Sequence, residues 1–405
     1  MSDRQLLSLA LVVSAALVMP EPLPAQAPTP PAGWRAFTTA FDQYAARDSI
    51  VGASVLVLRD GRVTARHDYG WGDRALGQRT DSNTIYHWAS ITKTLTAVAI
   101  MQLRDRGKLT LDDPITRYVP ELRQVHDPFG TMDDVTLGML LSHAAGFQDP
   151  TWPYKQGKPW EPFEPTRWSQ LVAMMPYQEL LFPPGSRYSY SNPGFIYLGR
   201  VIEQLTGDSW QTYVYKNLFG PLGITRSYFA ATPYYLAPYR SNNYYVERDS
   251  TGVEHVRANG RDFDPGITIP NGGWNAPLGD LVRWLGFLAG ATGGDSTLAA
   301  RYDIVLARRS LEEMWRSRYL ASEPVATAAV PADSMGMSFF ILWRHGVRFV
   351  GHTGSQAGFR SFFYINPRTR AGVIAAYNTT NVADPDQSAA GFRAVRDSAL
   401  ALIAR

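Results

Sequence analysis

Length, composition and charge place this chain among ordinary globular proteins. It has 405 residues, of which 45% are hydrophobic and 19% are charged, so it can form one large core or two smaller ones. The formal net charge of +3 is too small to indicate binding to nucleic acid or to a membrane surface. There is no cysteine, which excludes disulfides, thiol nucleophiles and cysteine-based zinc sites.

The N-terminal segment has the pattern of a secretory signal peptide. Residues 6–19 form an apolar run of 14, which is too short to span a bilayer comfortably. Residues 25–27 (AQA) follow as a small-residue cleavage site. We therefore predict a signal peptide over 1–27, a flexible leader over 28–35, and an exported protein, periplasmic or secreted, with no membrane span in its mature chain. Because a single Arg, offset by an Asp, precedes the apolar run, an uncleaved anchor remains an alternative.

From residue 35 onward, helical and strand patterns alternate along the chain. Asp60-Gly61 suits a type I′ turn and predicts a β-hairpin between its flanking runs. Apolar spacing and helix-end signals predict helices over 35–47, 90–106, 135–143, 194–206, 279–289 and 388–404. Apolar or alternating runs predict strands over 53–59, 62–69, 336–344, 346–352, 358–366 and 371–378. Two long stretches, 147–187 and 228–270, show neither pattern and are expected to be irregular loops.

Both ends of the chain therefore supply strands, and helices lie between them. This order predicts a single domain over 36–405 with α+β character. Its sheet part comes from both chain ends, and its helical part comes from the middle. The sequence contains no internal repeat.

Ser90-Ile91-Thr92-Lys93 is the first stretch that points to chemistry. The i, i+3 spacing at a helix start places Ser90 and Lys93 on one face. A serine hydroxyl needs a neighbouring base to become a nucleophile, and a desolvated neutral lysine can take its proton. Taken alone, the same residues fit a helix cap at Ser90 and a solvated Lys93 equally well.

Tyr190-Ser191-Asn192 is the second stretch. Tyr190 is a second candidate base, because a cation beside a phenol lowers its pKa from the usual value near ~10. Asn192 offers an amide that can bind a substrate carbonyl and orient Lys93. A packed aromatic at Tyr190 and a turn residue at Asn192, before Pro193, are the alternative interpretations.

His352-Thr353-Gly354-Ser355 is the third stretch, and it follows a strand-like run. Gly354 allows close approach of the backbone to a ligand. The backbone N–H groups of Ser355 and Ser90 are candidates for an oxyanion hole, in which each donor contributes about 3 kcal/mol. A tight turn between strands is the alternative.

Other chemistries have less support in the sequence. The remaining histidines show no metal-ligand spacing, so we expect no metal and no cofactor, and we interpret His143 as a packing or hydrogen-bonding residue. A Ser-His-Asp site with Ser142 or Ser191 as nucleophile is a rival hypothesis, but no G-x-S-x-G string supports it.

The three stretches in this order resemble the serine β-lactamase-related family, class C-like group. That group includes class C β-lactamases, D-alanyl-D-alanine carboxypeptidases, D-aminopeptidases and family VIII esterases. The resemblance covers nearly all of 36–405. It also rests on WGDRALGQRTDSNTIYHWASITKTLTA, GKLTLDDPITRYVPEL, VTLGMLLSHAAGF, PGSRYSYSNPGFIYLGRVIEQLTG and GHTGSQAGFRSFFYINP.

The resemblance implies a metal-free acyl-enzyme mechanism on a β-lactamase/transpeptidase-like fold, with an antiparallel sheet flanked by helices beside an all-helical region. Ser90 matches the nucleophile, Lys93 its partner, and Tyr190 the general base or proton shuttle. The matching substrate-binding residues are Asn192, His352, Thr353 and Gly354. Ser355 matches the residue whose backbone N–H completes the oxyanion hole.

Histidine at position 352 departs from the lysine of the β-lactamases themselves. Because histidine is mostly neutral at pH 7, it should hold a substrate carboxylate poorly unless Arg360 reaches into the site. We therefore expect a secreted serine hydrolase that cleaves small esters, amides or D-amino-acid peptides, with β-lactam hydrolysis weak. A penicillin-binding or sensor module that is acylated without turnover remains open, as does an interaction protein of the same fold.

Overall fold

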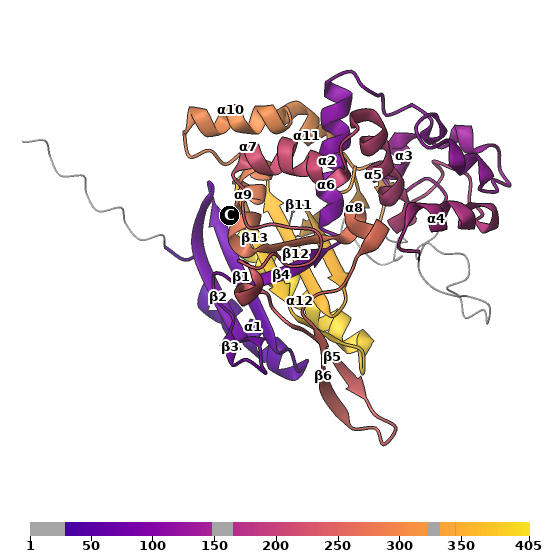
Figure 1. Cartoon of the computed structure of the whole chain (residues 1–405). Coiled ribbons are helices and arrows are strands. Elements are labelled where there is room, and N and C mark those ends of the chain that lie inside the picture. Colours follow the sequence, from indigo (N-terminus) through magenta and orange to yellow (C-terminus); the bar gives the residue numbers. More distant parts are fainter. Residues whose placement is uncertain (1–28, 148–164, 322–332, 345) are drawn as a thin grey trace, which may run out of the picture.

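The fold is built on a nine-stranded antiparallel sheet with helices on both faces (Figure 1). In this computed structural model, residues 29–147, 165–321, 333–344 and 346–405 are described. In spatial order the strands are β3 (Gln78–Arg79), β2 (Arg62–Asp73), β1 (Gly52–Arg59), β13 (Ala371–Tyr377), β12 (Phe359–Asn366), β11 (Val347–Gln356), β10 (Phe340–Arg344), β9 (Ser334–Met335) and β8 (Tyr319–Leu320). Strands from both chain ends pair in the middle, so the predicted α+β class is confirmed.

The two faces of this sheet belong to two different cores. Val55 and Val57 of β1 pack against the first and last helices, α1 (Trp34–Arg47) and α12 (Pro385–Leu402). Leu56 and Leu58 point the other way, into the larger core that contains α9 (Leu278–Ala289). The central strands β1 and β13 are buried along almost their whole length, and not only at alternate residues, because both faces of the sheet are covered.

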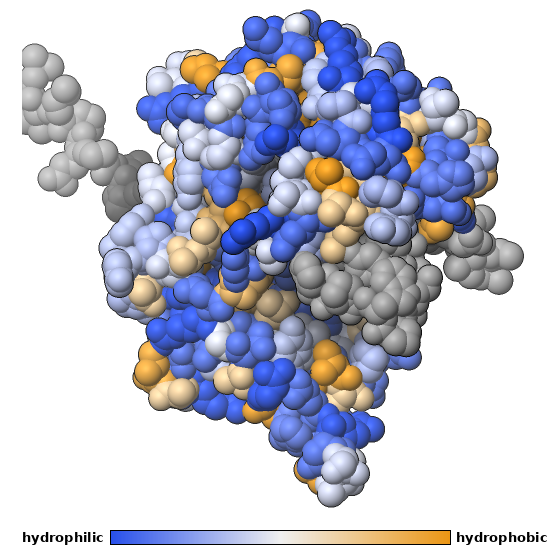
Figure 2. Space-filling model, turned by 45° about the vertical axis from the view of Figure 1, so that its right-hand side comes forward, coloured by the Kyte–Doolittle hydropathy of each residue, from blue (hydrophilic) through white to orange (hydrophobic). Residues whose placement is uncertain are grey.

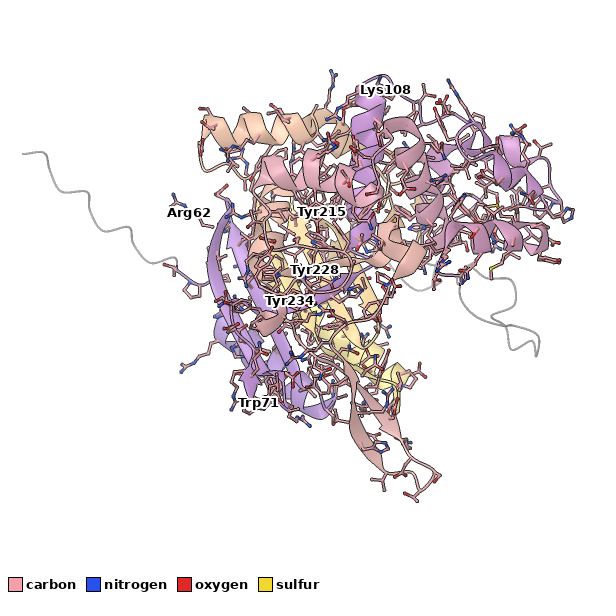
Figure 3. The ribbon with its side chains drawn as sticks, in the orientation of Figure 1. Arg62, Trp71, Lys108, Tyr215, Tyr228 and Tyr234 are labelled. Carbon is pink, nitrogen blue, oxygen red and sulfur yellow. The ribbon has the colours of Figure 1, made fainter. Side chains whose placement is uncertain are left out.

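The helical part lies beside the sheet, along the top and the upper right of Figure 1. Its central helix is α2 (Thr92–Asp105), which packs against α5 (Asn192–Thr206) and α8 (Ile269–Gly272). The other α-helices are α3 (Leu137–Leu141), α4 (Trp168–Met174), α6 (Trp210–Val214), α7 (Gly220–Leu222), α10 (Ser296–Val305) and α11 (Arg308–Met314). Nearly every residue of α2 is buried, so this helix is the shared core of the domain. Figure 3 shows Lys108, just beyond α2, at the outer edge of the molecule.

Two small sheets complete the fold. β4 (Ile85–Ala89) pairs with β7 (Trp274–Pro277), and β5 (Asn243–Arg248) lies between β14 (Thr379–Asn381) and β6 (Glu254–Gly260). The prediction of an irregular loop over 228–270 is therefore wrong in part, because β5 and β6 form a hairpin that projects from the body (Figure 1). Within that stretch Tyr228 is buried against Ile85, whereas Tyr234 is fully exposed (Figure 3).

Several expected boundaries shift in the structure. α4 begins at Trp168 inside the stretch 147–187, which was expected to be irregular. β11 continues to Gln356, so residues 352–355 lie in a strand and not in a turn. The predicted signal peptide over 1–27 lies outside the described residues.

No described helix is long and apolar enough to cross a membrane. On the face shown in Figure 2, small hydrophobic groups are scattered among hydrophilic residues. The predicted absence of a membrane span in the mature chain remains a prediction.

Candidate active site

Ser90 lies in the turn between β4 and α2. Ala89, the last residue of β4, has a φ of 48°, and this left-handed residue turns the chain sharply before Ser90. The turn is held by Thr92, whose hydroxyl donates to the Ala89 carbonyl at 2.6 Å and accepts from the Trp274 N–H at 3.0 Å. The N-cap of α2 is Ile91, without a side-chain cap bond, so Ser90 is not the helix cap.

Lys93 lies within hydrogen-bond distance of Ser90. Its side chain is fully buried, and its Nζ is 3.1 Å from Ser90 Oγ, 2.7 Å from Asn192 Oδ1 and 2.8 Å from the Asn271 carbonyl oxygen. As an ammonium, Lys93 donates to all three oxygens. As a neutral amine it has two N–H donors for Asn192 and Asn271, and its lone pair is left for the Ser90 hydroxyl. The same geometry therefore suits both protonation states.

The acceptors of Lys93 are positioned by tight helix packing. Asn192 is the first residue of α5, where Ser191 acts as N-cap and accepts from the Gly194 N–H at 3.2 Å. This cap bond gives the Ser191 hydroxyl a structural role, which argues against Ser191 as a rival nucleophile. A Cβ at Gly199 of α5 would lie 2.5 Å from the Pro270 ring, so glycine there lets α8 approach and present the Asn271 carbonyl.

Tyr190 stands beside this lysine. The Lys93 Nζ is 4.9 Å from the centre of the Tyr190 ring. The Tyr190 ring stacks on His143 with centroids 4.3 Å apart, and it lies 6.4 Å from the ring of His352. The structure thus brings together the predicted site residues Ser90, Lys93, Tyr190 and His352 from distant parts of the chain.

His352 is a buried, neutral histidine in β11. Only 1% of it is exposed, and its Nδ1–H donates to the Thr353 carbonyl at 2.5 Å. Burial, together with the Lys93 charge, lowers the pKa of His352 to about 3. Among the described charged groups, only Lys93 shifts the pKa of His352, and it lowers it. Position 352 therefore adds no positive charge at neutral pH.

Arg360 does not supply the missing cation. It is paired with Ser355 across β11 and β12, but its side chain donates to Ser388 Oγ at 2.7 Å and lies 4.3 Å from the centre of the Phe392 ring. Both partners belong to α12, on the opposite face of the sheet from the large core. The alternative in which Arg360 binds a substrate carboxylate is therefore wrong for this conformation.

Gly354 brings β11 against the end of β4. A Cβ at this position would lie 2.2 Å from the Trp88 carbonyl oxygen, so any side chain would push the two strands apart. Glycine at position 354 allows close contact with Trp88, whereas the sequence analysis expected it to allow close approach to a ligand. Because Ser355 follows Gly354 and Ser90 follows β4 by one residue, the two proposed oxyanion donors belong to neighbouring backbone segments.

Sequence reasoning missed one contributor to the site and the partner of another. The Asn271 carbonyl is a backbone group, so no side-chain pattern marks it. His143 was predicted to pack or to hydrogen-bond and does both, but its place against Tyr190 was not foreseen. The available signal for His143 was the string SHAAG (142–146), which belongs to the segment VTLGMLLSHAAGF that carries the family resemblance. Over 29–147, 165–321, 333–344 and 346–405, no cluster of His, Cys, Asp and Glu is suited to a metal ion.

Comparison with known proteins agrees with this geometry. A model of the Beta-lactamase family matches residues 37–397. The chain belongs to the β-lactamase family. Family membership and the shared fold confirm the resemblance drawn from the motifs.

Two curated relatives match large parts of the chain, and the name of one of them states an activity. Protein flp of Staphylococcus aureus (strain COL) is 24% identical over 336 residues, and the match covers 81% of this chain and 60% of flp. Esterase EstB of Burkholderia gladioli is 30% identical over 258 residues, covering 58% of this chain and 64% of EstB. The chain thus spans about 60% of the length of the first curated relatives it matches.

A solved structure of similar shape is D-amino acid amidase from Ochrobactrum anthropi SV3, complexed with L-phenylalanine amide. The TM-score is 0.71 at 20% identity, and the match covers 91% of this chain and 97% of the amidase. At this identity the likeness establishes the β-lactamase/transpeptidase-like fold, and the family it belongs to contains hydrolases.

Proposed function

We propose that this protein is an exported serine hydrolase that cleaves an ester or amide through an acyl-enzyme on Ser90. The observation that carries the proposal is the hydrogen bond between Ser90 Oγ and Lys93 Nζ at 3.1 Å. Asn192 and the Asn271 carbonyl hold the same nitrogen in place. A serine hydroxyl with a buried amine beside it has the base that nucleophilic attack requires.

Acylation begins when Ser90 Oγ attacks the substrate carbonyl carbon and its proton moves to the neutral Nζ of Lys93. The negative charge that develops on the carbonyl oxygen is stabilised by the backbone N–H groups of Ser90 and Ser355. Collapse of this intermediate expels the alcohol or amine, which takes up a proton relayed through Lys93 and Tyr190. Ser90 now carries the acyl group as an ester.

Deacylation reverses these roles with water as the nucleophile. Water attacks the ester carbonyl and gives a proton to the Lys93–Tyr190 pair. Ser90 Oγ leaves, recovers that proton and releases the carboxylic acid. The Asn192 amide binds the carbonyl of the substrate. Residues 352–354 of β11 form one wall of the site.

The substrate class follows from the charge of that wall. With His352 neutral and Arg360 turned towards α12, β11 offers no cation for a substrate carboxylate. Neutral esters and amides are therefore favoured over substrates with a free carboxylate, and β-lactam hydrolysis is weak. The names of the relatives, an esterase and a D-amino acid amidase, support this direction.

The test is mass spectrometry of purified 28–405 mixed with a short-chain p-nitrophenyl ester or with a penicillin, together with steady-state turnover of each. We expect rapid ester turnover with a transient Ser90 adduct, and loss of turnover by at least about a thousandfold in Ser90→Ala. Ser296→Ala, in the remote helix α10, is the matched control.

Two results would overturn the proposal. Full turnover by Ser90→Ala would remove Ser90 as the nucleophile. A lasting penicilloyl adduct without ester turnover would identify a penicillin-binding or sensor module. For localisation, a mature N-terminus near residue 28 in the exported fraction is expected, and an intact residue 1 on the exported protein would contradict cleavage.

A further inference from the structure

His143 makes three contacts with the segment that carries Tyr190. Its carbonyl accepts from the Ser189 N–H at 2.7 Å, and its Nδ1 accepts from the Ser191 N–H at 3.0 Å. Between these two bonds its ring stacks on the Tyr190 ring, with centroids 4.3 Å apart and planes 24° apart. One residue thus holds the backbone on both sides of the proposed proton shuttle and also the shuttle ring itself.

His143 can do this because it is itself immobilised. It follows α3, and only 1% of it is exposed. The ring of Phe195 lies 5.0 Å from its ring. Its φ of 56° is a left-handed conformation that histidine, asparagine and aspartate tolerate better than most residues. This conformation lets its main chain and its side chain face the same segment.

The hydrogen bonds also fix the protonation state of His143. Because Nδ1 accepts from a backbone N–H, the neutral ring carries its proton on Nε2. Burial, and to a lesser degree the Lys93 charge, hold the pKa of His143 well below its ordinary value. A group whose Nδ1 is already occupied and which stays neutral is poorly suited to be a base. Its ring contacts the rings of Tyr188, Tyr190 and Phe195.

We infer that His143 is a positioning residue that holds the Tyr190 ring next to the Lys93 amine. The inference rests on the proposed function, since it assigns His143 an effect on proton transfer through Tyr190. Lys93 Nζ lies 4.9 Å from the Tyr190 ring centre, and a small displacement of the ring weakens that interaction. The two groups can share one proton, and when Lys93 holds it the Tyr190 phenolate faces an ammonium. Losing this alignment raises the pKa of Tyr190, because the phenolate then loses that nearby positive charge.

Two variants separate the two contacts of the side chain. His143→Phe keeps a ring for the stack and loses the acceptor for the Ser191 N–H. His143→Asn keeps an acceptor near the Nδ1 position, tolerates the left-handed backbone and loses most of the stack. His67→Asn is the matched control, since His67 lies on β2 and bonds Asp42.

The first readout is the pH dependence of kcat/KM for the p-nitrophenyl ester. We expect each His143 variant to lose about tenfold to a hundredfold in kcat/KM, because misplaced catalytic groups are costly. We also expect the acid limb of the profile to move to higher pH in both variants and to stay in place in His67→Asn. Fluorophosphonate labelling of Ser90 and the melting temperature report whether the site and fold persist.

The second readout does not need turnover. NMR of protein labelled at the tyrosine ζ carbon, with Tyr190→Phe to assign the signal, follows the titration of Tyr190 directly. An upward shift of its pKa in the His143 variants supports the inference even if a variant is slow. Unchanged Tyr190 titration and an unchanged acid limb would overturn it and leave His143 a structural residue, whatever the loss of rate.

These outcomes are distinct from failure of the proposed function. If the wild type neither turns over ester nor labels at Ser90, the hydrolase proposal fails and the inference fails with it. If the wild type is active and the His143 variants match it within about twofold, the inference alone fails.

Discussion

The two walls of the site around Ser90 differ in whether they stabilise a positive charge. The wall formed by α2, α5 and α8 surrounds Lys93 with oxygen acceptors from Ser90, Asn192 and Asn271. The wall formed by β11 presents His352 next to the ring of Phe340, at 5.1 Å, with its pKa far below the usual value. Positive charge is thus stabilised beside Ser90 and is absent from the histidine of β11. Under the proposed function, this difference favours neutral substrates.

The largest effect is expected from removing the amine of Lys93. Lys93→Met keeps the length of the side chain and removes the amine, so Ser90 loses its base and two acceptors lose their donor. We expect kcat/KM for the ester to fall by about a thousandfold or more, in the upper part of the range for general-base catalysis. Steady-state kinetics measures this, and activity within tenfold of wild type would remove Lys93 from the mechanism.

A second expected effect is acid sensitivity from buried neutral histidines. Burial lowers the pKa of His87 to about 4 and that of His352 to about 3, and lowers that of His143 as well. The unfolded chain binds these protons near pH ~6.5, so stability is fully present above that pH and is lost as pH falls towards the folded values. Each histidine contributes about 1.4 kcal/mol per pH unit in that window.

Denaturant unfolding between pH 4 and 7 measures this loss. His87→Gln removes one of these groups and should make the fall in unfolding free energy shallower. A slope identical to wild type would show that His87 is not buried as a neutral group in the folded protein.

A third prediction concerns the addition of a positive charge to the β11 wall. His352→Lys should raise kcat/KM for a penicillin relative to the neutral ester by about tenfold, since a nearby ammonium can pair with the substrate carboxylate. In the wild type, a pKa of about 3 for His352 means that no limb of the pH–rate profile between pH 5 and 8 belongs to this residue. An unchanged substrate ratio in the variant would place His352 outside the binding wall.

The smallest effect is expected at Arg360, which faces away from the site. Arg360→Met removes the bond to Ser388 and should lower stability by about 1 kcal/mol. Because its guanidinium lies over Phe392 of α12, the ratio of penicillin to ester turnover should stay within about twofold of wild type. A clear drop in penicillin turnover alone would show that Arg360 reaches the substrate.

Local signals in the sequence were sufficient for the strands β1, β2 and β10 to β13, for the helices α1, α2, α3, α5, α9 and α12, and for the motif residues. The hairpin at Asp60-Gly61 forms as its turn chemistry predicts, with positive φ at both residues. Ser90 lies in the turn before α2 and not on the helix itself, but the i, i+3 spacing still brings its Oγ within 3.1 Å of Lys93 Nζ. The polar β5–β6 hairpin escaped prediction because β6 is largely exposed and carries no apolar alternation.

The sequence by itself determined the order of the three motifs, and with it the family and the candidates for the nucleophile and its partner. Only the tertiary structure decided that Lys93 bonds the Asn271 carbonyl, that His143 stacks on Tyr190, and that Arg360 points to α12. The physical reason is the range of the interactions. Turns and helix faces depend on neighbours a few residues apart, whereas burial, pKa and side-chain direction depend on groups that only the packed fold brings together.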